Sequence, residues 1–171
     1  MRKSAFAALL LAMMLTVCPT AFAARSEPVS VTGVSDLLGG QVGGTLVPDA
    51  AGNIHLRKAE YQGSFALEGE NIHVVGTQLI VLNGVLDATL SGPVAGSLTV
   101  TVDVSGNPVT VWQGTVHGRV IGLIFTGQAV AHGVGRYAGQ LLKLNYEERP
   151  ATAGNPNPEV FDLTGVVSHL P

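Results

Sequence analysis

The sequence predicts an all-β protein, an antiparallel β-barrel of about eight strands, with a β-sandwich as the alternative. All 22 glycines follow residue 32, where they separate short runs of Val, Leu, Ile and Thr. Within residues 98–104, apolar and polar side chains alternate, so one face of the strand is apolar and the other is polar. A helix has room for a single turn, at residues 35–38 before Gly39 and Gly40.

The first 23 residues have the features of a secretory signal peptide. Arg2 and Lys3 supply positive charge, residues 5–17 form an uncharged apolar run, and residues 21–23 match the small-x-small cleavage pattern. We therefore expect residues 1–23 to be removed and the protein to be exported, as a periplasmic or secreted protein. The apolar run is shorter than the roughly 20 residues that a membrane helix needs, and we expect no membrane span in the mature chain.

Cys18 is the single cysteine of the sequence. It leaves with the signal peptide unless it carries a lipid anchor, an alternative that Val17 disfavours because a lipoprotein signal has a small residue at that place. The mature chain then has no cysteine, which excludes disulfides, thiol catalysis and cysteine-bound zinc.

The mature chain is predicted to be one acidic domain. Residues 24–171 comprise 148 residues, enough for a single domain with a sizeable core. Loss of Arg2 and Lys3 leaves seven basic against twelve acidic residues, a net charge of −5 with neutral histidines, which argues against nucleic acid as a partner. Residues 24–53 contain two Gly-Gly pairs, and we expect a loosely ordered amino-terminal arm there.

Strands are predicted, in chain order, wherever runs of apolar and β-branched residues are bounded by turn residues. These runs are residues 54–67, 72–82, 85–90, 98–104, 109–117, 119–126, 140–147 and 160–169. Turns are predicted at residues 68–71, at Asn83-Gly84, which is the commonest two-residue hairpin signal, and at residues 105–108. Residues 149–158 contain three prolines and are predicted to form a long surface loop.

Two runs are apolar on both faces of a predicted strand, whereas a strand with one solvated face should alternate. They are residues 120–125 and the segment that begins at Val74-Val75 and ends with residues 79–82. A second sheet, the amino-terminal arm or another copy of the chain must cover the second face. On this ground we predict a homo-oligomer.

The sequence HGVGRYAGQ at residues 132–140 has two interpretations. Residues 133–138 fit the G-x-G-x-x-G/A phosphate fingerprint, in which the glycines join a parallel strand to a helix. Residues 140–147 instead have a mostly strand-like period, and the chain contains no second strand–helix unit. We therefore interpret Gly133, Gly135 and Gly139 as structural glycines of a tight turn between strands, and we expect no cofactor.

The glycines continue upstream with a regular spacing. Gly114, Gly118 and Gly122 recur every four residues, which keeps them on one face of a strand and leaves space for an aromatic ring. The predicted rings are those of Trp112, Phe125 and Tyr137.

The motif at residues 133–139, followed by Leu142-Lys143-Leu144, resembles the G-x-G-x-(Phe/Tyr)-x-G turn of small barrels such as allene oxide cyclase and the plant dirigent proteins. The resemblance implies an eight-stranded antiparallel barrel with an apolar lumen. It concerns a turn and carries none of the cyclase or phenol-coupling residues to this sequence.

Two pairs of histidine and arginine near predicted strand ends are the candidate binding residues. A guanidinium presents a planar fork of donors that suits a carboxylate or a phosphate. We name His117, Arg119, His132, Arg136 and the adjacent Tyr137 as candidates. The alternative is that the arginines form surface ion pairs with Asp103, Glu147 and Glu148.

Metal binding and nucleophilic catalysis lack a supporting pattern. The five histidines show no H-x-H or H-x-x-x-H spacing, although His117 and His132 could meet across a hairpin, and we expect no metal. The chain has no G-x-S-x-G elbow, and pairs of carboxylates arise by chance among twelve acids.

These observations favour an exported, non-enzymatic β-barrel that binds an apolar small molecule or a protein partner. The alternative is an isomerase or cyclase that acts inside a barrel lumen, where shape and a few polar groups steer the substrate. A third interpretation, an outer-membrane barrel, would require aromatic girdles, for which the sequence has few aromatic residues.

Overall fold

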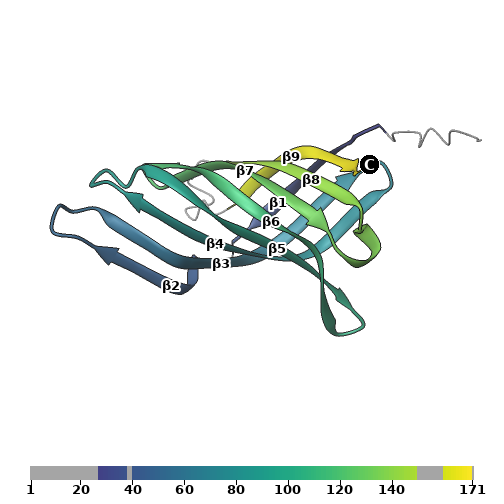
Figure 1. The fold of residues 1–171 in the computed structure, drawn as a ribbon, viewed down its shortest axis with the longest axis horizontal. Helices are drawn as coiled ribbons and strands as arrows, with labels where there is room; N and C mark the ends of the chain where they lie inside the picture. The colour runs from purple at the N-terminus through teal and green to yellow at the C-terminus, as the bar shows by residue number, and fades with distance from the viewer. Residues whose placement is uncertain (1–26, 38–39, 150–159, 171) are drawn as a thin grey trace, which may run out of the picture.

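The structure, a computed structural model, describes residues 27–37, 40–149 and 160–170 (Figure 1). The predicted signal peptide with Cys18 and nearly all of the predicted loop at residues 149–158 lie outside this part of the chain. The elements are β1 (Val29–Asp36), β2 (Gln41–Pro48), β3 (Ile54–Gly69), β4 (Ile72–Leu86), β5 (Gly92–Val104), β6 (Asn107–Ile121), β7 (Ile124–Gly133), the 3-10 helix η1 (Gly135–Tyr137), β8 (Gln140–Glu148) and β9 (Val160–His169).

Eight of these strands form a closed antiparallel barrel, which confirms the predicted fold class over the sandwich alternative. The hydrogen-bonded order is β1-β9-β8-β7-β6-β5-β4-β3, and β1 also pairs with β3. Val31, for example, lies opposite Gly69 of β3 and Gly165 of β9, so β1 is joined at both edges and closes the barrel. The segment expected to be a loosely ordered arm therefore supplies the closing strand.

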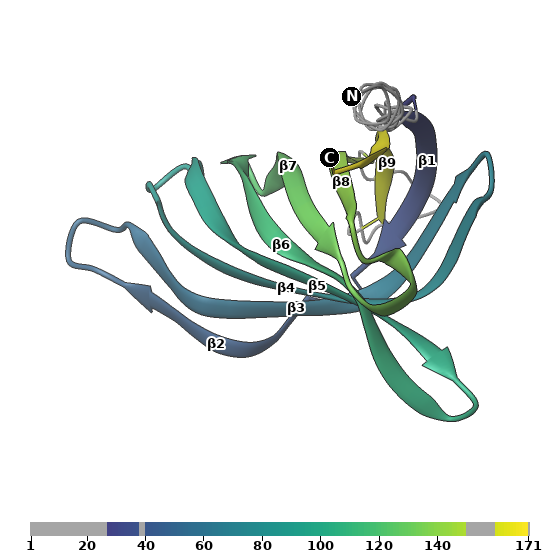
Figure 2. The ribbon, with the colours of Figure 1, turned by 45° about the vertical axis from the view of Figure 1, so that its right-hand side comes forward.

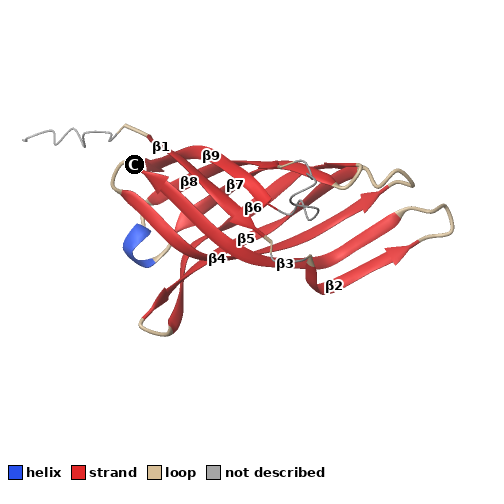
Figure 3. Ribbon diagram, turned by 180° about the vertical axis from the view of Figure 1, so that it is seen from behind, coloured by secondary structure: helices blue, strands red, loops and turns tan. Residues whose placement is uncertain are grey.

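The ninth strand, β2, extends the sheet beyond the barrel. It follows β1 along the same edge of β3, because Asp36 lies opposite Ser64 and Gln41 opposite Tyr61. β3 and β4 have 16 and 15 residues, whereas β8 and β9 have 9 and 10. The long strands therefore project past the short ones at one end of the barrel, as Figure 2 shows for the hairpin of β2 and β3. η1 lies at the opposite end (Figure 3).

Several predicted turns are confirmed and others are wrong. Ser105 and Gly106 have positive φ in the β5–β6 turn, and Asn71 does so in the β3–β4 turn. Asn83-Gly84 instead lies inside β4, and the chain turns at residues 87–91, where the Asp87 carboxylate accepts hydrogen bonds from the backbone N–H groups of Thr89 and Ser91. This Asx turn reverses the chain, while the pairing of Gly84 with Leu56 and Val94 carries β4 through the hairpin dipeptide.

Two other local predictions are corrected. The run at 119–126 is divided by the β6–β7 turn, where Gly122 and Leu123 have φ of 58° and 76°. The predicted helical turn at residues 35–38 is absent at its described residues, because Ser35 and Asp36 are the last residues of β1. The pairing of β1 with two neighbouring strands overrides the weak local capping signal.

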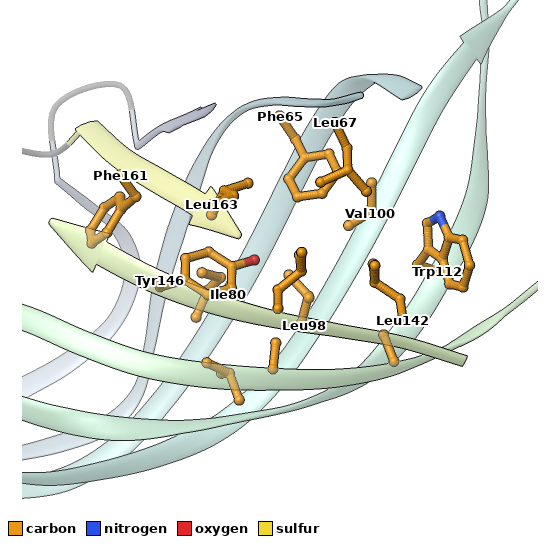
Figure 4. Close-up of a cluster of buried hydrophobic side chains, with 14 of the residues drawn as sticks. Phe65, Leu67, Ile80, Leu98, Val100, Trp112, Leu142, Tyr146, Phe161 and Leu163 are labelled. Atoms are coloured by element: carbon orange, nitrogen blue, oxygen red, sulfur yellow. The ribbon is translucent and has the colours of Figure 1, made fainter. Parts of the chain in front are cut away.

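Alternate side chains of each strand fill the barrel. On β8, Leu142, Leu144 and Tyr146 point inward and are at most 2% exposed, whereas Lys143 and Asn145 point outward. Figure 4 shows how the buried chains line up along the barrel, with Trp112 toward one end and Phe161 toward the other. The lumen is thus a packed apolar core over most of its length.

The glycine spacing in β6 has the predicted function at one of its positions. Gly118 lies opposite Gly127 on β7, and a Cβ at Gly118 would lie 2.7 Å from a ring carbon of Phe125. The absence of side chains at this pair therefore gives the Phe125 ring its place against the sheet. Gly122 belongs to the turn and does not share this face.

The two runs that are apolar on both faces leave part of their outward side uncovered in the single chain. Val74 is fully buried, but its neighbour Val75 is 59% exposed. In the second run, Val120 is buried, while Ile121 and Leu123 at the β6–β7 turn are more than 60% exposed. Self-association through such surfaces stays a prediction.

Candidate binding cavity

The barrel contains a cavity of about 360 Å³ whose lining includes residues on the projecting parts of β3 and β4. Its walls come from nearly every strand of the barrel. The lining residues are Leu37, Leu56, Tyr61, Ile80, Leu82, Leu86, Val120, Leu123, Phe125, Tyr146, Glu148 and Phe161. A volume of this size lies within the range of about 300–1,000 Å³ that is typical of small-molecule sites.

The cavity exists because the strands differ in length. Leu56, Ile80 and Leu82 occupy inward positions on the projecting parts of β3 and β4 and are at most 8% exposed. β8 ends at Glu148 and β9 begins at Val160, so these shorter strands form the opposite wall over only part of that length. Apolar side chains that would meet across a longer barrel instead surround an open space.

Three aromatic rings form a cluster at the floor of the cavity. Phe125, Tyr146 and Phe161 contact one another edge to face, with ring centroids 6.0 to 6.5 Å apart. Each ring is less than a tenth exposed, and all three line the cavity. Edge-to-face contacts are favourable because the positive edge of one ring meets the negative face of another.

Glu148 is the acidic residue of the cavity wall. It follows Leu142, Leu144 and Tyr146 on the inward face of β8 and is only 8% exposed. The backbone N–H of Phe125 donates a hydrogen bond to its Oε2 atom at 2.6 Å. This bond holds the carboxylate beside the aromatic cluster and offsets part of the cost of burying it.

Tyr146 contributes its ring to the cavity but turns its hydroxyl into the barrel. The phenol donates to Oε1 of Gln78 at 3.1 Å, and Nε2 of Gln78 donates to the hydroxyl oxygen of Ser35. All three side chains are buried. Burial raises the pKa of the Tyr146 phenol well above its usual value, so the group is neutral and acts as a hydrogen-bond donor.

The histidines and the first arginine predicted for binding point away from this cavity. His117 and Arg119 lie on the outward face of β6, and His132 lies on the outward face of β7. His117 is paired with Gln128 and His132 with Gln113, so the two imidazoles do not meet across the hairpin. No group of three or more metal-ligating side chains occurs within the described ranges. The role of these residues in binding stays a prediction.

The other two predicted residues, Arg136 and Tyr137, lie in η1 at the opposite end. The Tyr137 ring stacks on Trp112 with centroids 5.1 Å apart, and the Arg136 guanidinium lies 4.9 Å above the Tyr137 ring. Both residues border a shallow depression of about 520 Å³ together with Glu68, His73 and Gln140. The structure therefore places three of the five predicted residues on the outer face of β6 and β7 and the other two in η1.

The glycine motif forms a turn between antiparallel strands. Residues 133–139 connect β7 to β8 through η1, and Gly135 and Gly139 have φ of 60° and 81°. A Cβ at Gly133 would collide with the carbonyl of Tyr137. β8 is a strand paired with β7 and β9, so the parallel strand and helix of a dinucleotide-binding fold are not formed here.

The structure contains an arginine–carboxylate ion pair between Arg149 and Asp162, an acid that is not among the three expected partners. Arg149 donates to Asp162 through Nε at 3.0 Å and through Nη2 at 2.6 Å. The Arg149 guanidinium holds the pKa of the Asp162 carboxyl below its usual value. Glu148, which the sequence places among the surface partners of the arginines, is buried and lines the cavity.

Glu148 and Gln78 are the polar cavity and core residues that the predicted site lacks. The sequence contains a signal for both residues, because each occupies a position at which the two-residue alternation of its strand places inward-facing apolar side chains. Glu148 continues the alternation of Leu142, Leu144 and Tyr146, and Gln78 lies two residues before Ile80. A polar residue at an inward phase predicts a buried group with a specific partner.

Comparisons of the chain with family models, with curated proteins and with solved structures found no match. Among the described residues, no helix has the length and hydropathy that crossing a membrane requires.

Proposed function

We propose that the protein is a binding module that holds an apolar small molecule in the cavity of the barrel. The observation that carries this proposal is the cavity itself, of about 360 Å³, whose described lining is mostly apolar and includes one carboxylate. Sites for small molecules are mostly apolar and contain a few polar groups that orient the ligand. Aliphatic residues such as Ile80 and Leu82 supply the first feature, and Glu148 supplies the second.

The polar outward face of the barrel supports a barrel surrounded by water rather than the alternative of an outer-membrane barrel. The outward residues of β6 include Gln113, Thr115, His117 and Arg119, all of them exposed, whereas its inward residues include Trp112 and Val116. A barrel in lipid carries apolar residues on its outward face. Export and the resemblance to allene oxide cyclase and dirigent barrels stay predictions.

Binding is tested with the neutral dye N-phenyl-1-naphthylamine, whose fluorescence increases in an apolar environment. We expect the purified protein to bind the dye and Leu86→Trp to weaken binding by about tenfold or more, because the indole fills the cavity mouth. Val75→Trp is the matched control, since Val75 lies on the outward face of the same strand and is 59% exposed. Equal dye binding by both variants, or no binding by the wild type, would contradict the proposal.

A second candidate function is an isomerase or cyclase that acts in the same cavity. Glu148 favours it, because a carboxylate in an apolar site is a suitable group for removing a proton from a bound substrate. Glu148→Gln distinguishes the two functions. Catalysis is supported if the wild type turns over a substrate and Glu148→Gln does not, while both proteins bind the dye. A cavity that only binds gives no turnover in the wild type or in the variant.

A further inference from the structure

The cavity combines features that select a ligand by charge, and this inference rests on the proposed binding function. We propose that its ligand is a cationic amphiphile, with an ammonium head against Glu148 and the aromatic cluster and an alkyl body along the aliphatic wall. The juxtaposition of a buried carboxylate with the rings of Phe125, Tyr146 and Phe161 carries the inference.

The carboxylate provides the charge. Glu148 is 8% exposed, and its Oε2 atom is held by the Phe125 N–H at 2.6 Å, so its position is set before a ligand arrives. Among the described lining residues there is no Lys, Arg or His. The guanidinium of the next residue, Arg149, lies on the other side of β8 and engages Asp162 with two hydrogen bonds. A carboxylate on this wall favours a cationic head over an anionic one.

The rings provide the second element of recognition. An ammonium group is attracted to the face of an aromatic ring, and cages of several rings are the usual sites for quaternary ammonium groups. Phe125, Tyr146 and Phe161 are oriented at 64° to 72° to one another, and all three residues line the cavity. Tyr61, which is half-buried, adds a fourth ring to the lining.

The aliphatic wall fixes the other half of the ligand. Leu56, Ile80, Leu82 and Leu86 come from the projecting parts of β3 and β4 and lead from the aromatic floor toward the mouth. A straight alkyl chain buries its methylene groups against such side chains at about 0.8 kcal/mol each. The two halves of the cavity therefore match a charged head and an apolar tail.

The experiment compares three probes with the same alkyl chain, namely decyltrimethylammonium, decanol and decanoate, each used below its micellar concentration. Each probe displaces N-phenyl-1-naphthylamine from the protein at neutral pH. We expect decyltrimethylammonium to displace the dye at a concentration about tenfold lower than the concentration of decanol that is needed. The difference from decanoate should be larger still. An ammonium probe that is no better than decanol overturns the inference and leaves the binding function intact. If the dye and all three probes fail to bind, both proposals fail.

Variants identify the groups responsible. Glu148→Gln keeps an oxygen that can accept from the Phe125 N–H but removes the charge, and it should reduce the preference for ammonium over decanoate by about tenfold. Glu147→Gln is the matched control, because it removes the same charge one residue away on the exposed face of β8. Phe161→Leu keeps an apolar side chain without a ring and should weaken ammonium binding more than decanol binding. Unchanged selectivity in both Glu148→Gln and Phe161→Leu overturns the inference.

Discussion

The buried hydrogen bond between Tyr146 and Gln78 can be assigned an energy by mutation. Tyr146→Phe removes the hydroxyl that donates to Oε1 of Gln78 and leaves that oxygen buried without its donor, since Gln78 is 1% exposed. An unsatisfied buried polar group costs about 1–3 kcal/mol. We therefore expect Tyr146→Phe to lower the free energy of unfolding by about 2 kcal/mol, and Tm by roughly 4–8 °C in a domain of this size.

The assay is urea unfolding followed by circular dichroism, with the denaturation midpoint and slope fitted separately. The double variant Tyr146→Phe with Gln78→Leu removes both partners, and we expect it to be at least about 1 kcal/mol more stable than the sum of the single effects predicts. Tyr137→Phe is the control, because its hydroxyl makes no hydrogen bond among the described residues, and it should change stability by less than about 0.5 kcal/mol. Additive effects in the double variant would refute the reasoning.

Three further predictions concern the surface. Arg149 lowers the pKa of the Asp162 carboxyl. The stability that this ion pair contributes is therefore complete above the ordinary pKa of an aspartate and is lost as the pH falls through the lowered pKa. Carbon-detected NMR titration of the wild type and of Arg149→Ala measures the pKa of Asp162 in both proteins. The pKa of Asp49 is held below its usual value chiefly by the Asn53 side chain, and the same NMR titration should show a higher pKa in Asn53→Ala. The homo-oligomer is predicted from the exposed apolar residues of the two runs, so native mass spectrometry should show fewer oligomers for Ile121→Lys, which places a charge on that surface.

Local sequence patterns predicted the strands well because burial in a barrel follows the two-residue alternation of each strand. The bounds predicted for β9, residues 160–169, are those of the structure, and the turn at Ser105-Gly106 is correct because both residues adopt positive φ there. The failure at Asn83-Gly84 has a physical cause. Gly84 pairs with Leu56 on one side and Val94 on the other, and these two ladders outweigh a hairpin preference that is purely local.

The closure of the barrel and the cavity could not be predicted from local patterns. Closure depends on β1 meeting β3 and β9, and the second of these contacts joins Val29 to Val167, across nearly the whole described chain. The cavity depends on the difference in length between opposing strands, which appears only when the register is known. The chemistry of His117 and Arg119 makes them candidates for binding, whereas their positions in the alternation of β6 place them on the outward face.

The two roles of Glu148, in the fold and in the cavity, can be separated by comparing two substitutions. Glu148→Leu removes the acceptor of the Phe125 N–H, a buried donor, and should destabilise the protein by about 1–3 kcal/mol even though it makes the cavity wall entirely apolar. Glu148→Gln retains an acceptor and avoids the burial of a charge, so we expect it to unfold within about 1 kcal/mol of the wild type. Urea unfolding measures both. If Glu148→Leu is as stable as Glu148→Gln, the hydrogen bond to Phe125 contributes nothing to the fold, and the carboxylate would then be positioned by other contacts.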